Sequence, residues 1–468
     1  MSATNGAPRP ASKSTSGRGA RLGTFEVMYL RLERPAWPGH FGGLATLEGA
    51  TLLDASGRLK LAEIRRRLER RLPAVPELRR RLHFPGPLRG RPLWVDDNGF
   101  RIEHHVREAA IPSPGGDAQL LEAAARIYGD LLDRRRPLWE FWFLTGLDGG
   151  RVGVLLKLHH SVADGQAAVK VMGSLFDLAP DAPDPAPVPW TPQAAPGGWP
   201  LLADNLAGKM RTFGRRAAVL AHPGRMLRGL RLFAQVVRKT AGMKGAARTS
   251  LNPPVQAGRR VGFLRLGLAS VKEAAHAHEG KVNDVVLALW AGGLRELLTS
   301  RGEPVAGLEL TVGVMLSTRS TTDASIDNQV GTVVLPLPIG EADVARRLDR
   351  IISATREAKD RPRSAAIMGV LAGLASSAVG RHFMVRQRAT NVLASNVAGP
   401  PVPMFVLGAP ILDILPLLDL SANLGLVICA FSYAGRLYLV VTADAGGFPD
   451  LGVLIGGMER DWHALASS

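Results

Sequence analysis

The 468-residue sequence contains a single cysteine, Cys429, so no disulfide can form within the chain and no cysteine cluster is available to bind a metal. This usage is typical of a protein from a reducing, cytoplasmic compartment. Cys429 lies in the apolar run from residue 424 to residue 431. We therefore predict that Cys429 is a small core residue and not a nucleophile.

Long apolar runs are also absent. No stretch reaches 18 uninterrupted apolar residues, and the nearest candidate, residues 365–379, is short and rich in alanine, glycine and serine. A chain of this kind is not expected to span a membrane. The first 22 residues are rich in small and basic residues and lack the apolar centre of a signal peptide. We predict that residues 1–22 form a disordered basic tail.

Acidic residues are scarce relative to basic ones, with 41 Asp and Glu against 58 Lys and Arg, which gives a net charge of +17. Much of the excess lies between Leu201 and Arg260, where 13 basic residues accompany one acidic residue, Asp204. This stretch also carries apolar residues at helical spacing, interleaved with arginines: Met226, Leu227, Leu230, Phe233, Ala234 and Val237.

A basic amphipathic helix is typical of proteins that bind a membrane surface. The alternative is a solvated face on an ordinary helix between domains. We expect no nucleic-acid partner, because no nucleic-acid-binding motif accompanies the charge. The charge pattern instead favours a cytoplasmic protein that associates peripherally with the inner membrane face or with lipid droplets.

The richest stretch of the sequence runs from Leu156 to Gly165 and contains His159, His160 and Asp164. Two short apolar runs, residues 141–146 and 151–158, precede it and are joined through Asp-Gly-Gly, which predicts two paired strands and a tight turn. Apolar residues then recur at helical spacing at Ala168, Val171, Met172, Leu175 and Phe176. The histidines are thus expected where a buried strand ends, and the aspartate where a helix begins.

A histidine at such a position suits acid–base chemistry, because imidazole titrates near neutral pH. If His160 is the base, activity should rise with pH through its titration near neutrality. Other interpretations remain open: Asp164 is also suited to cap the helix, and His159 to pack in the core. A metal site is disfavoured, since adjacent histidines diverge and no further His or Cys cluster completes a ligand set.

This loop resembles the HHxxxDG motif of the acyltransferase superfamily that includes chloramphenicol acetyltransferase, peptide-synthetase condensation domains and the bacterial wax ester synthase/diacylglycerol acyltransferases. Three further stretches are similar to motifs of the last group: its PLW motif at residues 132–140, its ND motif at 282–288 and its SNV-type segment at 395–400. The matches extend from about Phe25 to Trp462. Two departures are Glu26, where aspartate is commoner, and residues 328–331, where a Gly-Asn pair is usual.

The resemblance implies roles for particular residues. His160 would be the general base, with His159 beside it in the catalytic loop. Asp164 would pair with an arginine and so order the loop, and Asn283 would donate an amide hydrogen bond to the oxyanion or position a substrate. Substrate-binding candidates are Gly165, Pro137, Leu138, Trp139, Asp284 and Asn396.

The implied reaction is transfer of a fatty acyl group from acyl-CoA, a co-substrate, to the hydroxyl of diacylglycerol or a long-chain alcohol. The product would be a triacylglycerol or a wax ester, and no bound cofactor or metal is implied. One alternative is a condensation-type enzyme that takes its acyl group from a carrier protein. Another is a catalytically silent protein that binds lipid surfaces.

Strands and helices alternate along the chain, which predicts an α/β fold. The resemblance implies two chloramphenicol-acetyltransferase-like subdomains joined by a helical linker, with the active site at their interface. We place the subdomains at residues 23–180 and 259–468, and a Pro-rich, then basic helical linker at 181–258. A second histidine pair, His104-His105, lacks a following Asp-Gly and is assigned a structural role.

The individual elements expected are of two kinds. Strands are predicted at residues 39–48, 93–95, 100–106, 260–266, 308–316, 332–338, 421–431 and 437–444. Helices are predicted at residues 59–72, 118–132, 270–278, 342–359 and 364–379, and one more begins at Asn283 as its N-cap.

Overall fold

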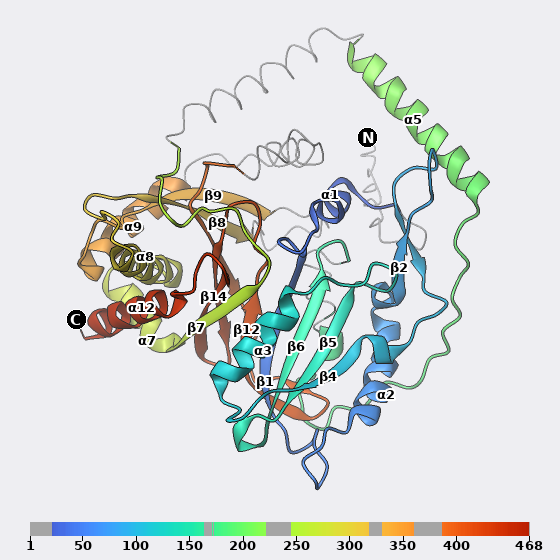
Figure 1. Cartoon of the computed structure of the whole chain (residues 1–468), viewed down its shortest axis with the longest axis horizontal. Coiled ribbons are helices and arrows are strands. Elements are labelled where there is room, and N and C mark those ends of the chain that lie inside the picture. The colour runs from blue at the N-terminus through green and yellow to red at the C-terminus, as the bar shows by residue number, and fades with distance from the viewer. Residues whose placement is uncertain are drawn as a thin grey trace, which may run out of the picture.

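The structure is a computed structural model that describes residues 21–162, 171, 173–220, 245–317, 330–359 and 386–467. Two six-stranded sheets lie side by side and form the body of the protein (Figure 1). A short hairpin of β2 (Arg80–His83) and β3 (Leu93–Asp96) is separate from both sheets. The predicted α/β class is confirmed.

The first sheet has the order β11-β12-β1-β6-β5-β4. Its strands are β11 (Phe405–Val406), β12 (Ala409–Leu417), β1 (His40–Glu48), β6 (Arg151–His159), β5 (Trp139–Thr145) and β4 (Val106–Ala110). The predicted hairpin is the antiparallel pair β5–β6, joined through the turn η4 (Asp148–Gly150). On its other side β6 runs antiparallel to β1, and this register sets His40 opposite His159.

The second sheet has the order β7-β14-β13-β10-β8-β9. Its strands are β7 (Arg259–Gly267), β14 (Arg436–Asp444), β13 (Leu426–Tyr433), β10 (Val392–Ala398), β8 (Leu310–Ser317) and β9 (Val330–Leu337). The strand β10, which carries the SNV-type segment, is central and runs parallel to both β8 and β13. Cys429 on β13 is buried, as expected of a core residue, and burial raises the pKa of its thiol to about 12.

The helices pack around these sheets. They are α1 (Thr24–Leu32), α2 (Leu61–Arg71), α3 (Asp117–Gly129), α5 (Gly198–Leu220), α7 (Leu268–Ala277), α8 (Val282–Ser300), α9 (Val344–Lys359) and α12 (Leu451–Ala466). Short 3-10 turns are η1 (Leu72–Ala74), η2 (Pro76–Arg79) and η3 (Ile102–His104). The helices α7, α8, α9 and α12 gather beside the second sheet (Figure 1), with α8 buried between its neighbours.

Two strands of the C-terminal half complete the first sheet, because β12 pairs with β1 along most of its length and β11 pairs with β12. Asp413 of β12 accepts hydrogen bonds from Arg265 on β7 (2.9 Å) and Tyr438 on β14 (2.8 Å), both in the second sheet. The hydroxyl of Tyr128 donates to the carbonyl oxygen of Leu417 at 3.1 Å. The hydrogen bonds of Asp413 therefore connect the first sheet to the second.

Three expectations about local structure need correction. Residues 100–106 do not form a strand: Ile102–His104 is a 3-10 turn and the strand begins at Val106. Asn283 is not the N-cap of α8, because the cap is Lys281 and Asn283 lies inside the first turn. The helices α1 and α12 and the strands β2, β10, β11 and β12 are absent from the sequence-based expectations.

Several other expectations lie outside the described residues. They concern the tail up to residue 20, the apolar stripe at residues 226–237, the departure at residues 328–329 and the helix at residues 364–379. The subdomain boundaries stay a prediction. Within the described ranges, no helix is long and apolar enough to cross a membrane.

Candidate active site

The two histidines of the motif lie at the end of β6, where their backbone is held from both sides. The N–H of His159 donates to the carbonyl oxygen of Leu138 at 3.1 Å, and the N–H of His160 donates to that of Gly39 at 3.0 Å. The strand end is thus fixed between the PLW segment and the loop before β1. Asp164 and Gly165 lie outside the described residues.

The imidazole of His159 is fully buried. Its Nδ1 lies 2.6 Å from the hydroxyl oxygen of Ser161 and 3.0 Å from the backbone nitrogen of the same residue, whose N–H points at it. Its Nε2 lies 3.5 Å from Oε2 of Glu33. Gly39 also borders it: its φ is +65°, and a Cβ there would lie 3.0 Å from Nε2. Only glycine fits this position without strain.

Glu33 connects this histidine to the segment that precedes Pro137. Its side chain is 3% exposed and accepts a hydrogen bond from Nε of Arg134 at 2.6 Å. Arg134 also donates to the carbonyl oxygen of Leu30, near the end of α1. The chain of contacts from Arg134 through Glu33 to His159 therefore ties the PLW segment, α1 and the histidine loop together.

His160 is enclosed by aromatic rings. Tyr29 of α1 stacks on it with ring centroids 4.5 Å apart and an interplanar angle of 16°, and Phe41 of β1 lies at 4.8 Å. Burial, with a smaller contribution from His159, lowers the pKa of His160 to about 3. The ring is therefore neutral and able to accept a proton throughout the neutral range. This corrects the expectation that activity rises as His160 titrates near neutral pH.

A second buried acid, Asp419, lies in the segment between β12 and β13 and interacts with Gly39 and Tyr29, both neighbours of His160. Burial raises the pKa of Asp419 to about 7, against the opposing effect of Arg259, whose Nη2 lies 3.9 Å away. Arg259 also donates to the carbonyl oxygen of Ala36 at 2.7 Å. Burial and the charge of Asp419 raise the pKa of Tyr29 to about 12, so its hydroxyl stays protonated.

The PLW residues lie beneath the loop and are buried. The indole of Trp139 donates to the carbonyl oxygen of Leu78 at 2.7 Å and stacks on His105 with centroids 4.5 Å apart. Nδ1 of His105 in turn donates to the carbonyl oxygen of Trp139 at 2.8 Å. All of these contacts are internal, so Leu138 and Trp139 support the histidine loop from below, and His105 has the structural role assigned to it.

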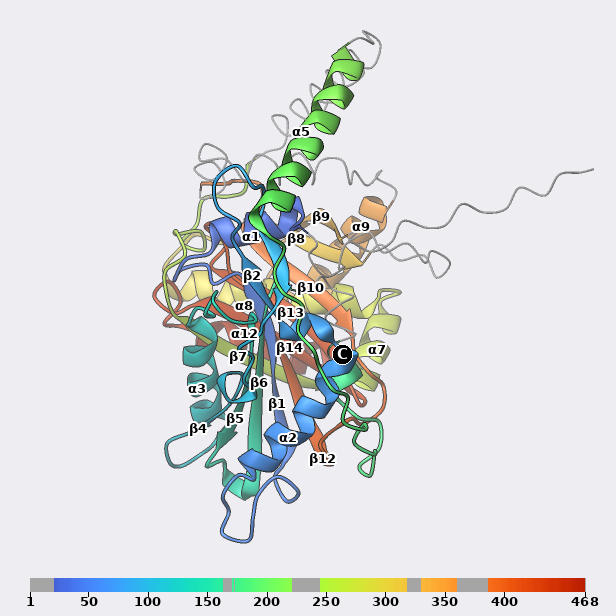
Figure 2. The same cartoon turned by 90° about the vertical axis from the view of Figure 1, so that its right-hand side faces the viewer.

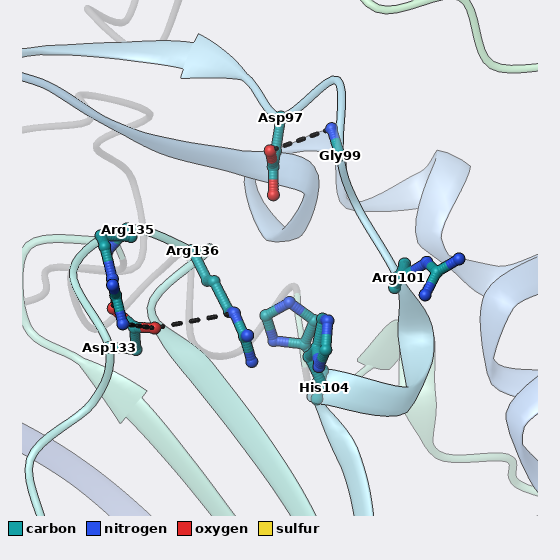
Figure 3. A pocket seen from close by; sticks show the side chains of 8 residues that line it. Asp97, Gly99, Arg101, His104, Asp133, Arg135 and Arg136 are labelled. Atoms are coloured by element: carbon teal, nitrogen blue, oxygen red, sulfur yellow. Dashed lines mark hydrogen bonds and ion pairs between the residues drawn. The ribbon is translucent and has the colours of Figure 1, made fainter.

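A polar pocket of about 360 Å³ lies beside this support, and Figure 3 shows its lining. Arg136 and His104 point toward one another, whereas Arg101 points away. Arg135 and Arg136 both pair with Asp133, at 3.1 and 3.6 Å. The pocket is charged on both sides, and it contains neither His159 nor His160.

The ND and SNV-type segments are brought together. Nδ2 of Asn396 on β10 donates to Oδ1 of Asn283 on α8, with a distance of 3.4 Å. The carboxylate of Asp284 is buried and accepts from the N–H of Lys281 (2.9 Å) and the hydroxyl of Thr355 (2.9 Å). Asp284 therefore caps α8, and of these three residues Asn283 and Asn396 are the ones in contact with each other.

Sequence reasoning missed Tyr29, Glu33, Gly39 and Asp419. Tyr29 lies in α1 and Glu33 is its C-cap, four residues later, so the two side chains lie on the same side of the helix. That spacing alone does not single them out from other helices. In the described part of the chain, we find no group of three His, Cys, Asp or Glu side chains placed to hold a metal ion.

Comparison with known families covers most of the chain. The family model for the wax ester synthase/diacylglycerol acyltransferase catalytic domain matches residues 22–286, and that for the C-terminal domain matches residues 326–466. The chain belongs to the wax ester synthase/diacylglycerol acyltransferase family. As predicted from its motifs, it is an acyltransferase.

Two relatives within this family come from Mycobacterium tuberculosis. A putative diacylglycerol O-acyltransferase of Mycobacterium tuberculosis H37Rv is 33% identical over 451 residues, which is 92% of this chain and 87% of the relative. A probable diacylglycerol O-acyltransferase of the same strain is 30% identical over 79% of this chain and 80% of its own.

Solved structures show the same architecture. The wax ester synthase/diacylglycerol acyltransferase of Marinobacter aquaeolei VT8 aligns with a TM-score of 0.71 at 23% identity, over 96% of this chain and 100% of its own. The first condensation domain of the calcium-dependent antibiotic synthetase aligns with a TM-score of 0.56 at 18% identity, over 97% of this chain and 96% of its own. The family match, and not the condensation fold, decides the assignment.

Proposed function

We propose that this family member transfers a fatty acyl group from acyl-CoA to the hydroxyl of diacylglycerol or a long-chain alcohol, with His160 as general base. The observation that carries the proposal is the environment of His160. Its backbone is fixed by Gly39, its ring is clamped by Tyr29 and Phe41, and it is neutral at physiological pH. A neutral imidazole in a fixed orientation can accept the proton of an incoming alcohol.

The proposed reaction requires no covalent enzyme intermediate. His160 takes the proton as the alcohol oxygen attacks the thioester carbonyl, and the carbonyl carbon becomes tetrahedral. When the C–S bond breaks, the imidazolium returns the proton to the sulfur of the departing CoA, and the ester is released. The base is thus regenerated in each turnover.

Glu33 and His159 position the base in this proposal. We assign the proton of His159 to Nε2, which lies 3.5 Å from the Glu33 carboxylate, so that Nδ1 accepts from the N–H of Ser161 in the turn after His160. Arg134 holds Glu33 in turn. Loss of the Glu33 charge would let the proton of His159 move to Nδ1, where it opposes the N–H of Ser161. The turn that carries His160 would then loosen.

Asn283 is the proposed oxyanion donor. Its carbonyl oxygen is used by Asn396, an orientation that leaves the amide hydrogens of Asn283 available. Among the described residues we find no acceptor for those hydrogens. A donor of this kind is typically worth about 10²–10³ in turnover. The family resemblance adds that Asp164 orders the loop by pairing with an arginine.

The identities of the substrates rest on the family. Both mycobacterial relatives are named as diacylglycerol O-acyltransferases, which supports diacylglycerol as the acceptor. Such substrates collect in membranes and lipid droplets, so we place the protein peripherally at these surfaces in the cytoplasm. The basic stretch between residues 201 and 260 supports this placement, because cationic segments are attracted to anionic lipids.

The test is an acceptor panel. Purified protein is incubated with palmitoyl-CoA and, separately, diolein or hexadecanol, and the His160→Ala variant is the control. Triacylglycerol or wax ester should form with the wild type and fall by at least about a hundredfold in the variant. The absence of ester in every mixture, or ester only from a carrier-protein thioester, would refute the proposed donor and acceptor.

A further inference from the structure

The helix α5 exposes a narrow stripe of large apolar side chains. Trp199, Leu206, Met210 and Phe213 are 82%, 53%, 67% and 70% exposed. Since successive residues of an α-helix are about 100° apart, all four lie within about 60° of one another around the helix axis. Single exposed apolar residues are common, but four on one line of one helix are a surface for something to cover.

The opposite side of α5 fixes only its beginning to the body of the protein. Leu201 is buried against Leu93 and Val95 of the β2–β3 hairpin. Asp204 pairs with Arg21 at 2.7 Å, and Nδ2 of Asn205 donates to the carbonyl oxygen of Leu88 at 2.6 Å. These three anchors all lie in the first turns of the 23-residue helix.

Beyond these anchors the helix stands clear of the sheets, as Figure 2 shows. From residue 206 to residue 214, within the described part of the chain, we find no hydrogen bond or ion pair to any other element. Over this part of the helix Leu206, Met210 and Phe213 are exposed.

The charge of the helix identifies the partner. Lys209 and Arg211 are exposed on α5, and the wider stretch from residue 201 to residue 260 holds 13 basic residues and one acidic residue. A second copy of this basic segment would be repelled, whereas an anionic lipid surface offers both negative charge and an apolar layer. An apolar stripe flanked by cations is the pattern of helices that lie in a membrane interface.

We propose that α5 docks the protein on anionic lipid surfaces by inserting Trp199, Leu206, Met210 and Phe213 among the lipids. The docking deepens the proposed function, because it would bring the enzyme to the layer where diacylglycerol and long-chain alcohols reside. It assigns the attachment to a helix that precedes, in the sequence, the apolar pattern at residues 226–237.

The first experiment measures sedimentation of the full chain with phosphatidylglycerol vesicles and with phosphatidylcholine vesicles. The triple variant Leu206→Ser/Met210→Ser/Phe213→Ser should lose at least about tenfold in partitioning to phosphatidylglycerol vesicles. The matched control Leu178→Ser/Val188→Ser/Val402→Ser changes three apolar residues that are also exposed, by 73%, 58% and 48%, but lie outside α5. The control should partition within about twofold of the wild type.

A second measurement reports insertion directly. The only cysteine, Cys429, is 1% exposed, so Phe213→Cys provides a single accessible thiol for an environment-sensitive fluorophore. Its emission should shift to the blue with phosphatidylglycerol vesicles. An unshifted label, or a triple variant that sediments as the wild type does, would overturn the proposal.

Two further readouts separate docking from catalysis and from self-association. The triple variant should turn over a short, water-soluble alcohol at the wild-type rate, since α5 carries none of the proposed catalytic residues. Vesicle binding needs no turnover, so failure of the acyl-transfer reaction would leave it measurable. A wild-type dimer that the triple substitution converts to a monomer, without a change in vesicle binding, would assign the stripe to a second copy and overturn lipid docking.

Discussion

The chain contains two histidine pairs, and the structure gives them different uses. In each pair one ring is buried and hydrogen bonded: His105 donates to Trp139, and His159 accepts from Ser161. The second ring differs. His104 lines an open polar pocket between arginines, whereas His160 lies between the rings of Tyr29 and Phe41.

This difference bears on the proposal that His160 is the base. Both buried environments lower a pKa, that of His105 to about 4 and that of His160 to about 3. His105 uses its Nδ1 within the fold, in a layer that supports the PLW segment. His160 is kept neutral, and in the described part of the chain we find no hydrogen bond from its ring. His160 is distinguished as the candidate base by the ring of Tyr29, which orients it, and by ring nitrogens that make no hydrogen bond to the described residues. Its pKa alone does not distinguish it from His105.

The largest expected effect comes from removing the second ring of each pair. His160→Ala should lower kcat by at least about a hundredfold, because a general base contributes about 10²–10⁴. His104→Ala removes the corresponding ring of the other pair and should leave kcat within about twofold. Circular dichroism and steady-state kinetics on both variants provide the check, and equal losses in the two would contradict the different roles of the pairs.

The next effect tests the positioning of His160 by its neighbours. Glu33→Gln keeps the shape of the side chain but removes its charge, and we expect kcat to fall about tenfold with KM unchanged, as for an interaction that acts on the transition state. Glu33→Asp should recover part of the loss. Arg134→Met should cost a similar factor.

The Glu33→Gln/Arg134→Met double variant should lose little more than either single one, because the two side chains act as one unit. Selective ¹⁵N labelling of histidine provides a second readout, since loss of the Nε2–H tautomer of His159 changes its ring nitrogen shifts. Strict additivity of the two losses, with an unchanged tautomer, would make Glu33 a merely structural residue.

His105→Ala should act on stability instead of turnover. The change removes a buried hydrogen bond and a ring stacked on Trp139, and we expect it to lower the free energy of unfolding by about 2–3 kcal/mol. Urea titration measures that cost, while kcat per folded molecule should stay within about threefold. A stable variant with a hundredfold lower kcat would contradict the structural role.

The smallest effect concerns pH. With a pKa of about 3, His160 stays unprotonated from pH 5.5 to 8, so its own titration should not change the wild-type rate across that range. Tyr29→Ala admits water and should raise the pKa toward the ordinary value of about 6.5. Since only neutral imidazole accepts a proton, the variant's rate should then fall as pH drops below about 6.5. A variant with a flat normalised profile would mean that burial by Tyr29 is not what lowers the pKa.

Helices and strands with a regular apolar pattern are predicted from the sequence. Those that contain residues unfavourable for their type, such as proline in a strand or glycine in a helix, are missed. The strand β12 contains Pro410, Asp413 and Pro416, which argue against a strand until the partners of Asp413 are known. The helix α12 contains three glycines, which lower its helix propensity. Its Gly457 allows close approach to α8, since a Cβ there would lie 3.1 Å from the Cα of Gly293.

The site divides in the same way. His159, His160 and Asn283 follow from motifs, and the contact between Asn283 and Asn396 agrees with the grouping of those motifs. Glu33, Tyr29 and Gly39 contact the histidines only because α1 and the loop before β1 fold against the end of β6. The spacing of residues in the sequence does not predict that arrangement. The same holds for the start of α8, whose N-cap lies two residues before Asn283, because the Asp284 carboxylate accepts from the backbone N–H of Lys281.

The pairing of β1 with β12 has a consequence for synthesis on the ribosome. Leu44 lies opposite Leu415, so about 370 residues must be made after β1 before its second neighbour exists. At about 5–20 residues per second this takes roughly 20–70 s. During that interval one edge of β1 is without its final neighbour, and open edges invite pairing with other chains. The first sheet of this enzyme can therefore be completed only after the C-terminal half is made, even though its motif loop is translated early.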